Sequence, residues 1–142
     1  FMGYGNLEHE VIKFAAKHDN IYFHEAVSPD VLLSYTSSAD FGISFIEDLC
    51  LNYRYCLPNK IFEYMMTGIP VICSNLIEMK NVVNTHQLGL VANTNDSQGF
   101  LECVKLSESV DYPKLIENVA SARTIFNWKQ QEKVIFTMYD NL

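Results

Sequence analysis

A helix–turn–strand unit in the middle of the chain, Leu57–Ser74, most constrains the fold. It reads LPNKIFEYMMTGIPVICS. Pro58 suits the first turn of a helix, because the N–H that it lacks would have no partner there. Gly68 supplies the left-handed cap that ends such a helix. The run Ile69–Cys73 is rich in β-branched residues, which predicts a strand buried on both faces of a sheet.

The start of this helix is also a candidate anion site. The first N–H groups of a helix have no partner within it, and its partial positive charge favours a phosphate. Here those groups belong to Asn59, Lys60 and Ile61. Glu63 follows one turn later, and a carboxylate is well suited to accept hydrogen bonds from two vicinal hydroxyls. The alternatives are ordinary ones: a solvated carboxylate at Glu63 and plain surface charge at Lys60.

The remaining sequence predicts helices alternating with short strands. The order β-α-β-α-β in the first half implies a parallel sheet with right-handed crossovers. We therefore predict an α/β fold, a Rossmann-like parallel sheet with helices on both faces, in one domain over residues 1–142. Strands are expected at 21–23, 41–45, 69–73 and 88–91, and residues 1–5 are expected to be the tail of another strand followed by a glycine turn. Helices are expected at 7–18, 28–37, 58–68, 75–84, 96–106, 113–123 and 127–141.

Caps and apolar spacing support several of these helices. Gly5 or Asn6 is the expected cap of the first helix, and Ser28 of the second. The side chains expected to be buried are Leu7, Val11, Phe14 and Ala15 in the first helix, Val31, Leu32 and Tyr35 in the second, and Trp128, Val134, Ile135 and Met138 in the last.

Two glycines near the start allow two interpretations. Gly3 and Gly5 follow an apolar pair, Phe1-Met2. They form a tight turn, or they let the backbone approach a ligand at a strand's end. A lone G-x-G does not distinguish these.

Composition bounds the function classes. The 142 residues carry a net charge of −7, which argues against general nucleic-acid binding. Four cysteines without a C-x-x-C pair and four scattered histidines argue against a metal site and favour free thiols in a reducing cytoplasm. No apolar run reaches the roughly 20 residues that span a bilayer.

The central unit resembles the signature of group 1 (GT4-like) glycosyltransferases, in particular the subclass with PNKxFEY before the glycine. Two flanking stretches are similar to further parts of that family: 21–45 to a preceding strand–helix–strand unit, and 126–139 to the final helix. Together the three stretches cover nearly the whole chain.

The resemblance implies the donor-binding, C-terminal half of a GT-B enzyme. Such an enzyme transfers a hexosyl group from a nucleotide-diphosphate sugar, with UDP favoured, and needs no cofactor or metal. Glu63 would bind the ribose, and the region of Val27 the nucleobase. The other donor-binding candidates are Asn59, Lys60, Ile61, Leu57, Tyr55, Gly3 and Gly5.

The chain departs from the family in two places. Many members carry a sugar-contacting Glu eight residues before the helix Glu, where this chain has Tyr55. The Tyr55 hydroxyl or the backbone at Leu57 would have to replace it. No residues match the family's Arg/Lys pair after the domain's first strand. We therefore expect that strand and the N-terminal acceptor domain to be missing, and the fragment to be inactive alone.

Further expectations concern partners and competing functions. Surfaces exposed by truncation predict a homodimer, and the full-length protein is expected in the cytoplasm, peripheral to a membrane. One competing function is a nucleotide-sugar epimerase of GT-B architecture. The other is a degenerate, non-catalytic Rossmann-like module. A receiver-like module fits poorly, because Asp40 precedes its strand.

Overall fold

The computed structural model describes residues 1–140, which form two compact units. The first unit is Phe1–Tyr35 and the second begins at Thr36. Each unit is described by itself below.

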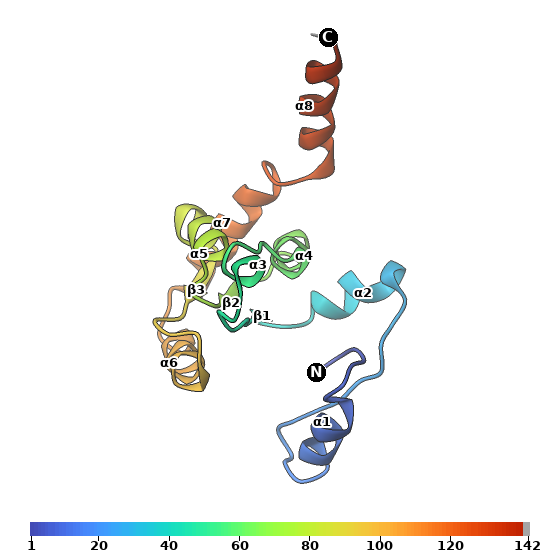
Figure 1. Ribbon diagram of the computed structural model, residues 1–142, viewed down its shortest axis with the longest axis vertical. Coiled ribbons are helices and arrows are strands. Elements are labelled where there is room, and N and C mark those ends of the chain that lie inside the picture. The colour runs from blue at the N-terminus through green and yellow to red at the C-terminus, as the bar shows by residue number, and fades with distance from the viewer. Residues whose placement is uncertain (141–142) are drawn as a thin grey trace. The chain divides into compact units, whose positions relative to one another are not determined.

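The second unit is built on a three-stranded parallel sheet (Figure 1). Its strands are β1 (Gly42–Ser44), β2 (Val71–Cys73) and β3 (Gly89–Val91), in the order β1-β2-β3. The register places Ser44 beside Cys73, and Cys73 beside Val91. The expected parallel sheet and these three strands are confirmed, each strand being shorter than its apolar run.

Capping residues mark the ends of several helices in the second unit. Gly68 ends the central helix with a φ of 86°, the left-handed cap that the sequence predicted. Asp96 and Asp111 cap the helices that follow them. The helices are α3 (Leu51–Arg54), α4 (Asn59–Thr67), α5 (Ile77–His86), α6 (Ser97–Ser107), α7 (Tyr112–Arg123) and α8 (Trp128–Asp140). The single turn α3 was not predicted.

The core of the second unit lies on both faces of β2. Val71 and Cys73 face one cluster, and Ile72, which alternates with them, faces another. The first cluster holds side chains of α4, α5 and α7, and the second holds Cys103 of α6. Helices therefore cover both faces, as predicted, and the unit is consistent with a Rossmann-like fold.

The first unit contains α1 (Glu8–Ala15) and the start of α2 (Pro29–Thr36). Its only β pairing among the described residues is one parallel bridge, between Met2 and His24. The predicted strand at 21–23 is therefore wrong, because a lone bridge does not extend into a ladder. The predicted caps Gly5 and Asn6 are also wrong, since Leu7 precedes the first helical residue and makes no side-chain cap.

The predicted burial in the two N-terminal helices and in α8 is largely wrong. α1, α2 and α8 contain no buried residue. The amphipathic spacing is present, but burial also needs an apolar neighbour that covers it. The exposed side chains include Leu7, Phe14, Val31, Tyr35, Trp128, Val134, Ile135 and Met138. Residue 141, the expected helix end, lies outside the described residues.

The four cysteines are free thiols in very different environments. Cys50 is exposed, whereas Cys73 and Cys103 are buried. Burial raises the pKa of the Cys73 thiol to about 12. Cys73 is therefore a packing residue of the core rather than a reactive thiol.

Candidate functional site

The start of α4 lies at the carboxyl edge of the sheet, the edge at which open α/β sheets bind ligands. Pro58 precedes the helix in an extended conformation and makes no side-chain cap. The N–H of Ile61 donates to the Pro58 carbonyl oxygen at 3.1 Å. Within residues 1–140, the N–H groups of Asn59 and Lys60 have no hydrogen-bond partner. Two of the three predicted backbone donors are therefore open.

The neighbouring helix starts on this edge are less suited to an anion. α5 also lacks a side-chain cap, but its first turn carries the acidic Glu78. α6 is capped by Asp96, whose carboxylate accepts from the Gly99 N–H at 2.9 Å. The first turn of α4 has no acidic residue and contains Lys60. Of the three, α4 therefore offers the most favourable field for a phosphate.

Packing on the sheet fixes the position of α4. Ile61 and Met65 are 1% and 2% exposed and lie in the main core cluster. The Tyr64 hydroxyl donates to the Ile43 carbonyl at 2.9 Å, and a Cβ on Gly42 would overlap the Tyr64 ring. Burial raises the pKa of Tyr64, which keeps the phenol protonated as a donor. α4 thus rests directly on β1.

Glu63 lies on the turn that follows Asn59. The residue is half-buried, and its carboxylate has no hydrogen-bond or ion-pair partner among the described residues. Lys60, three residues earlier, is exposed and has no such ion pair either. Residues three and four apart share one side of a helix. An unpaired cation and an unpaired carboxylate are therefore neighbours at the open end of α4.

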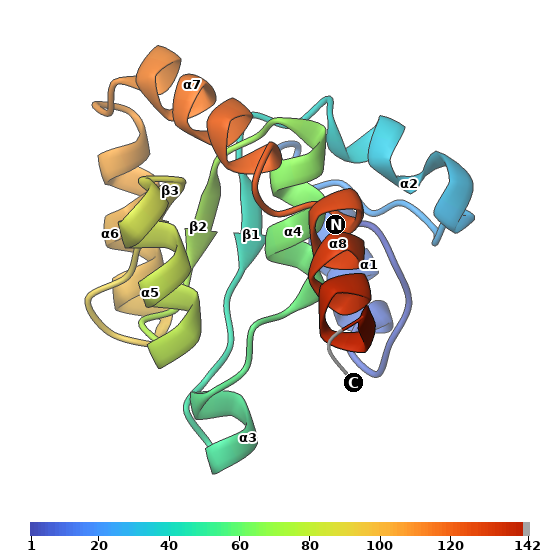
Figure 2. The ribbon, with the colours of Figure 1, turned by 90° about the horizontal axis from the view of Figure 1, so that it is seen from above.

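A projecting arm, residues 45–57, connects β1 to α4 and contains α3 (Figure 2). The Arg54 Nε lies 3.1 Å from both carboxylate oxygens of Asp48, a pairing that the sequence analysis missed. That hydrogen bond and the Asp48 charge raise the pKa of Arg54. At the end of the arm, Tyr55 is 57% exposed, and the half-buried Leu57 packs against the main core cluster.

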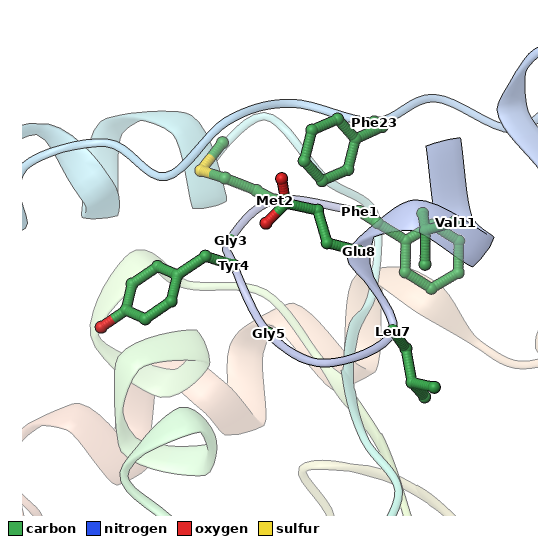
Figure 3. Close-up of a pocket in the computed structure, with 9 residues that line it drawn as sticks. All are labelled: Phe1, Met2, Gly3, Tyr4, Gly5, Leu7, Glu8, Val11 and Phe23. Atoms are coloured by element: carbon green, nitrogen blue, oxygen red, sulfur yellow. The ribbon is translucent and has the colours of Figure 1, made fainter. Parts of the chain in front are cut away.

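The other predicted residues belong to the first unit. Gly3 and Gly5 line a pocket of about 180 Å³, together with apolar side chains and Glu8 (Figure 3). Gly3 has a φ of 140° and donates its N–H to the His24 carbonyl at 3.2 Å. The Gly5 carbonyl accepts from the Glu8 N–H, which turns the chain into α1. Val27 is half-buried and does not line this pocket.

Comparison with known proteins identifies the family. No curated protein matches the chain. None of the helices in the described part of the chain is long and apolar enough to cross a bilayer. Residues 4–130 match the family described as "Glucosyltransferase 3-like, C-terminal domain". That match covers most of the chain and supports a glycosyltransferase domain, as the central signature predicted. The chain belongs to the Glucosyltransferase 3-like, C-terminal domain family.

Proposed function

We propose that this chain is the donor-binding half of a GT-B glycosyltransferase of the group 1 (GT4-like) type, and that it binds a nucleotide-diphosphate sugar. The observation that carries the proposal is the open start of α4. Two unpaired N–H groups and the Lys60 ammonium lie there at the ligand-binding edge of a parallel sheet. A diphosphate is the ligand that such donors match best.

The diphosphate is also the leaving group of the reaction. During transfer, the bond between the sugar's anomeric carbon and the diphosphate oxygen breaks. A new bond forms between the anomeric carbon and the oxygen of an acceptor hydroxyl, whose proton is taken up by the released diphosphate. Negative charge grows on the diphosphate as the bond breaks. Fixed N–H dipoles at Asn59 and Lys60, together with the Lys60 charge, stabilise that charge without reorganising.

Glu63 is the proposed ribose-binding residue. Its carboxylate is unpaired within the described residues and lies one turn from the open helix start. A carboxylate accepts hydrogen bonds from both vicinal hydroxyls of a ribose. Leu57 and Tyr55, at the end of the arm, are proposed to contact the sugar.

The remaining assignments follow the family resemblance. Val27 is the proposed nucleobase contact, and Gly3 and Gly5 a close backbone approach to the donor. We propose a UDP-hexose as the donor. Because the family is described as a C-terminal domain, we also propose an N-terminal, acceptor-binding domain as partner. The chain alone would then bind nucleotide without completing transfer.

Ligand-observed NMR with UDP, GDP and ADP tests the proposal. We expect one of the three to bind the chain and Glu63→Ala to abolish its binding. Glu78→Ala is the matched control, because Glu78 is also a carboxylate near a helix start on the same edge. It should leave binding unchanged. The proposal fails if no nucleotide binds, or if both variants bind as well as the wild type.

A further inference from the structure

The Ser44 hydroxyl is a buried polar group that has no hydrogen-bond partner among the described residues. Ser44 is the last residue of β1 and is 3% exposed. Of the buried side-chain polar atoms in the described part of the chain, its Oγ is the one with no hydrogen-bond partner. A buried polar group in that state is destabilising, since its hydrogen bonds to water are lost and not replaced. Such a group calls for a physical reason.

The sheet geometry places this hydroxyl on the face that α4 covers. Side chains two apart on a strand point to the same face, so Ser44 shares the face of Gly42. A Cβ at Gly42 would meet the Tyr64 ring of α4. Across the sheet, Ser44 is in register with Cys73, whose side chain belongs to the same α4-facing cluster.

The direction of α4 then places Ser44 near the helix start. α4 lies in the crossover between two parallel strands, so it runs opposite to β1. From Gly42 to Ser44 the strand advances about 6.6 Å, at about 3.3 Å per residue. At about 1.5 Å per residue, the same distance along α4 is about four residues. Starting at Tyr64, that leads back to Lys60 and the first turn.

We infer that Ser44 is a third donor of the proposed anion site, binding a phosphate oxygen through its hydroxyl beside the N–H groups of Asn59 and Lys60. The inference rests on the proposed function. It assigns a partner to a hydroxyl that has none among the described residues, and it places a neutral donor under a helix end that carries no side-chain cap. A hydrogen bond to a charged oxygen is among the stronger kinds.

Ser44→Ala, compared with Ser74→Ala, tests the inference. The Ser74 hydroxyl is also buried, but it accepts from the Ile46 N–H and so has a structural role. Thermal unfolding without ligand should show that Ser74→Ala is less stable than the wild type. Ser44→Ala should be as stable as the wild type or more stable, because the change removes an unsatisfied group.

Ligand binding supplies the second readout. UDP, GDP and ADP are titrated into the protein. The free nucleoside of each is titrated as a control ligand that lacks the phosphates. For the nucleotide that binds, Ser44→Ala should weaken affinity about tenfold or more, while affinity for the nucleoside stays unchanged. Equal losses for nucleotide and nucleoside would overturn the inference, as would an unchanged nucleotide affinity.

Glu63→Ala separates failure of this inference from failure of the proposed function. If Glu63→Ala abolishes nucleotide binding and Ser44→Ala does not weaken it, the donor site stands and Ser44 is no part of it. If the wild type binds none of the three nucleotides, both the donor site and the role of Ser44 are refuted.

Discussion

Two helix starts on the same edge of the sheet show how an anion site can be recognised. α6 begins behind Asp96, whose carboxylate already accepts the Gly99 N–H, so that helix start satisfies its own donor. α4 begins behind Pro58, which has no side-chain acceptor, and its first two N–H groups are unpaired among the described residues. A helix start with its own acidic cap is a structural feature. A helix start without one, on the ligand-binding edge, leaves its donors for a ligand.

The largest effect is expected from removing the packing that positions α4. Met65→Ala should lower the free energy of unfolding by about 2–5 kcal/mol, because it leaves a cavity in a closely packed core. Met138→Ala in α8 is the control, since Met138 is 66% exposed. It should change stability by less than about 0.5 kcal/mol. Urea unfolding of both variants measures the difference, and equal losses would show that α8 is as well packed as α4.

A smaller loss is expected from crowding the contact between α4 and β1. Gly42→Ala should cost about 1–3 kcal/mol, because the new Cβ would overlap the Tyr64 ring. Gly5→Ala is the control: a Cβ there meets nothing within 4 Å, and Gly5 has no positive φ. Thermal unfolding compares the two. A neutral Gly42→Ala would mean that Tyr64 does not lie against the strand.

An acidic cap on α4, like the one on α6, should raise the stability of the fold and lower the affinity for nucleotide. Pro58→Asp places a carboxylate at the helix start, which should stabilise the fold by about 0.5–1 kcal/mol. The same carboxylate competes with a phosphate for the N–H groups, so nucleotide affinity should fall about tenfold, or about 1.4 kcal/mol. Pro58→Ala separates the loss of proline from the gain of charge. Calorimetric titration showing unchanged affinity for Pro58→Asp would place the anion elsewhere.

The smallest effect concerns the cap of α6 and its pH dependence. Hydrogen bonds from the Gly99 N–H and the Thr94 hydroxyl hold the pKa of Asp96 below its usual value. A carboxyl whose folded pKa is lowered stabilises the fold fully above its unfolded pKa, about 3.9. That stabilisation is lost as the pH falls through the lower, folded value.

Asp96→Asn keeps a capping side chain but cannot titrate. The stability difference between the wild type and this variant should therefore shrink below about pH 4 and stay constant above about pH 6. Thermal unfolding of both proteins across this range measures it. If the stability difference between the two proteins did not change with pH, the Asp96 carboxylate would not stabilise the start of α6.

Local signals predicted the centre of the molecule well. Pro58 and Gly68 mark the start and the end of α4 through backbone preferences that need no tertiary context. The structure places the helix between them. The same rules led to the open N–H groups of Asn59 and Lys60. Sequence reasoning did not foresee that Ile61 would use its N–H within the first turn, because that depends on the local geometry of the helix start.

Strand pairing and side-chain burial depend on contacts between distant segments, which local sequence patterns do not predict. Ile21-Tyr22-Phe23 has the composition of a strand, yet pairing there is limited to the bridge at His24. Trp128 and Ile135 follow a helical apolar spacing, yet both are exposed. Composition and period describe one segment, whereas strands and buried faces need a second segment in the right place. The unpaired Ser44 hydroxyl leaves no trace in the sequence for the same reason.

The buried thiol of Cys73 gives the second unit an internal reporter of its opening. Alkylating reagents attack thiolates, and Cys73 offers neither access nor ionisation in the folded state, with a pKa of about 12. Cys50 is exposed and should react directly with iodoacetamide. The slow phase of labelling, at the buried thiols of Cys73 and Cys103, then measures how often the core around the sheet opens to solvent. Any ligand that binds only the folded state should slow that phase, whether or not the ligand is a substrate.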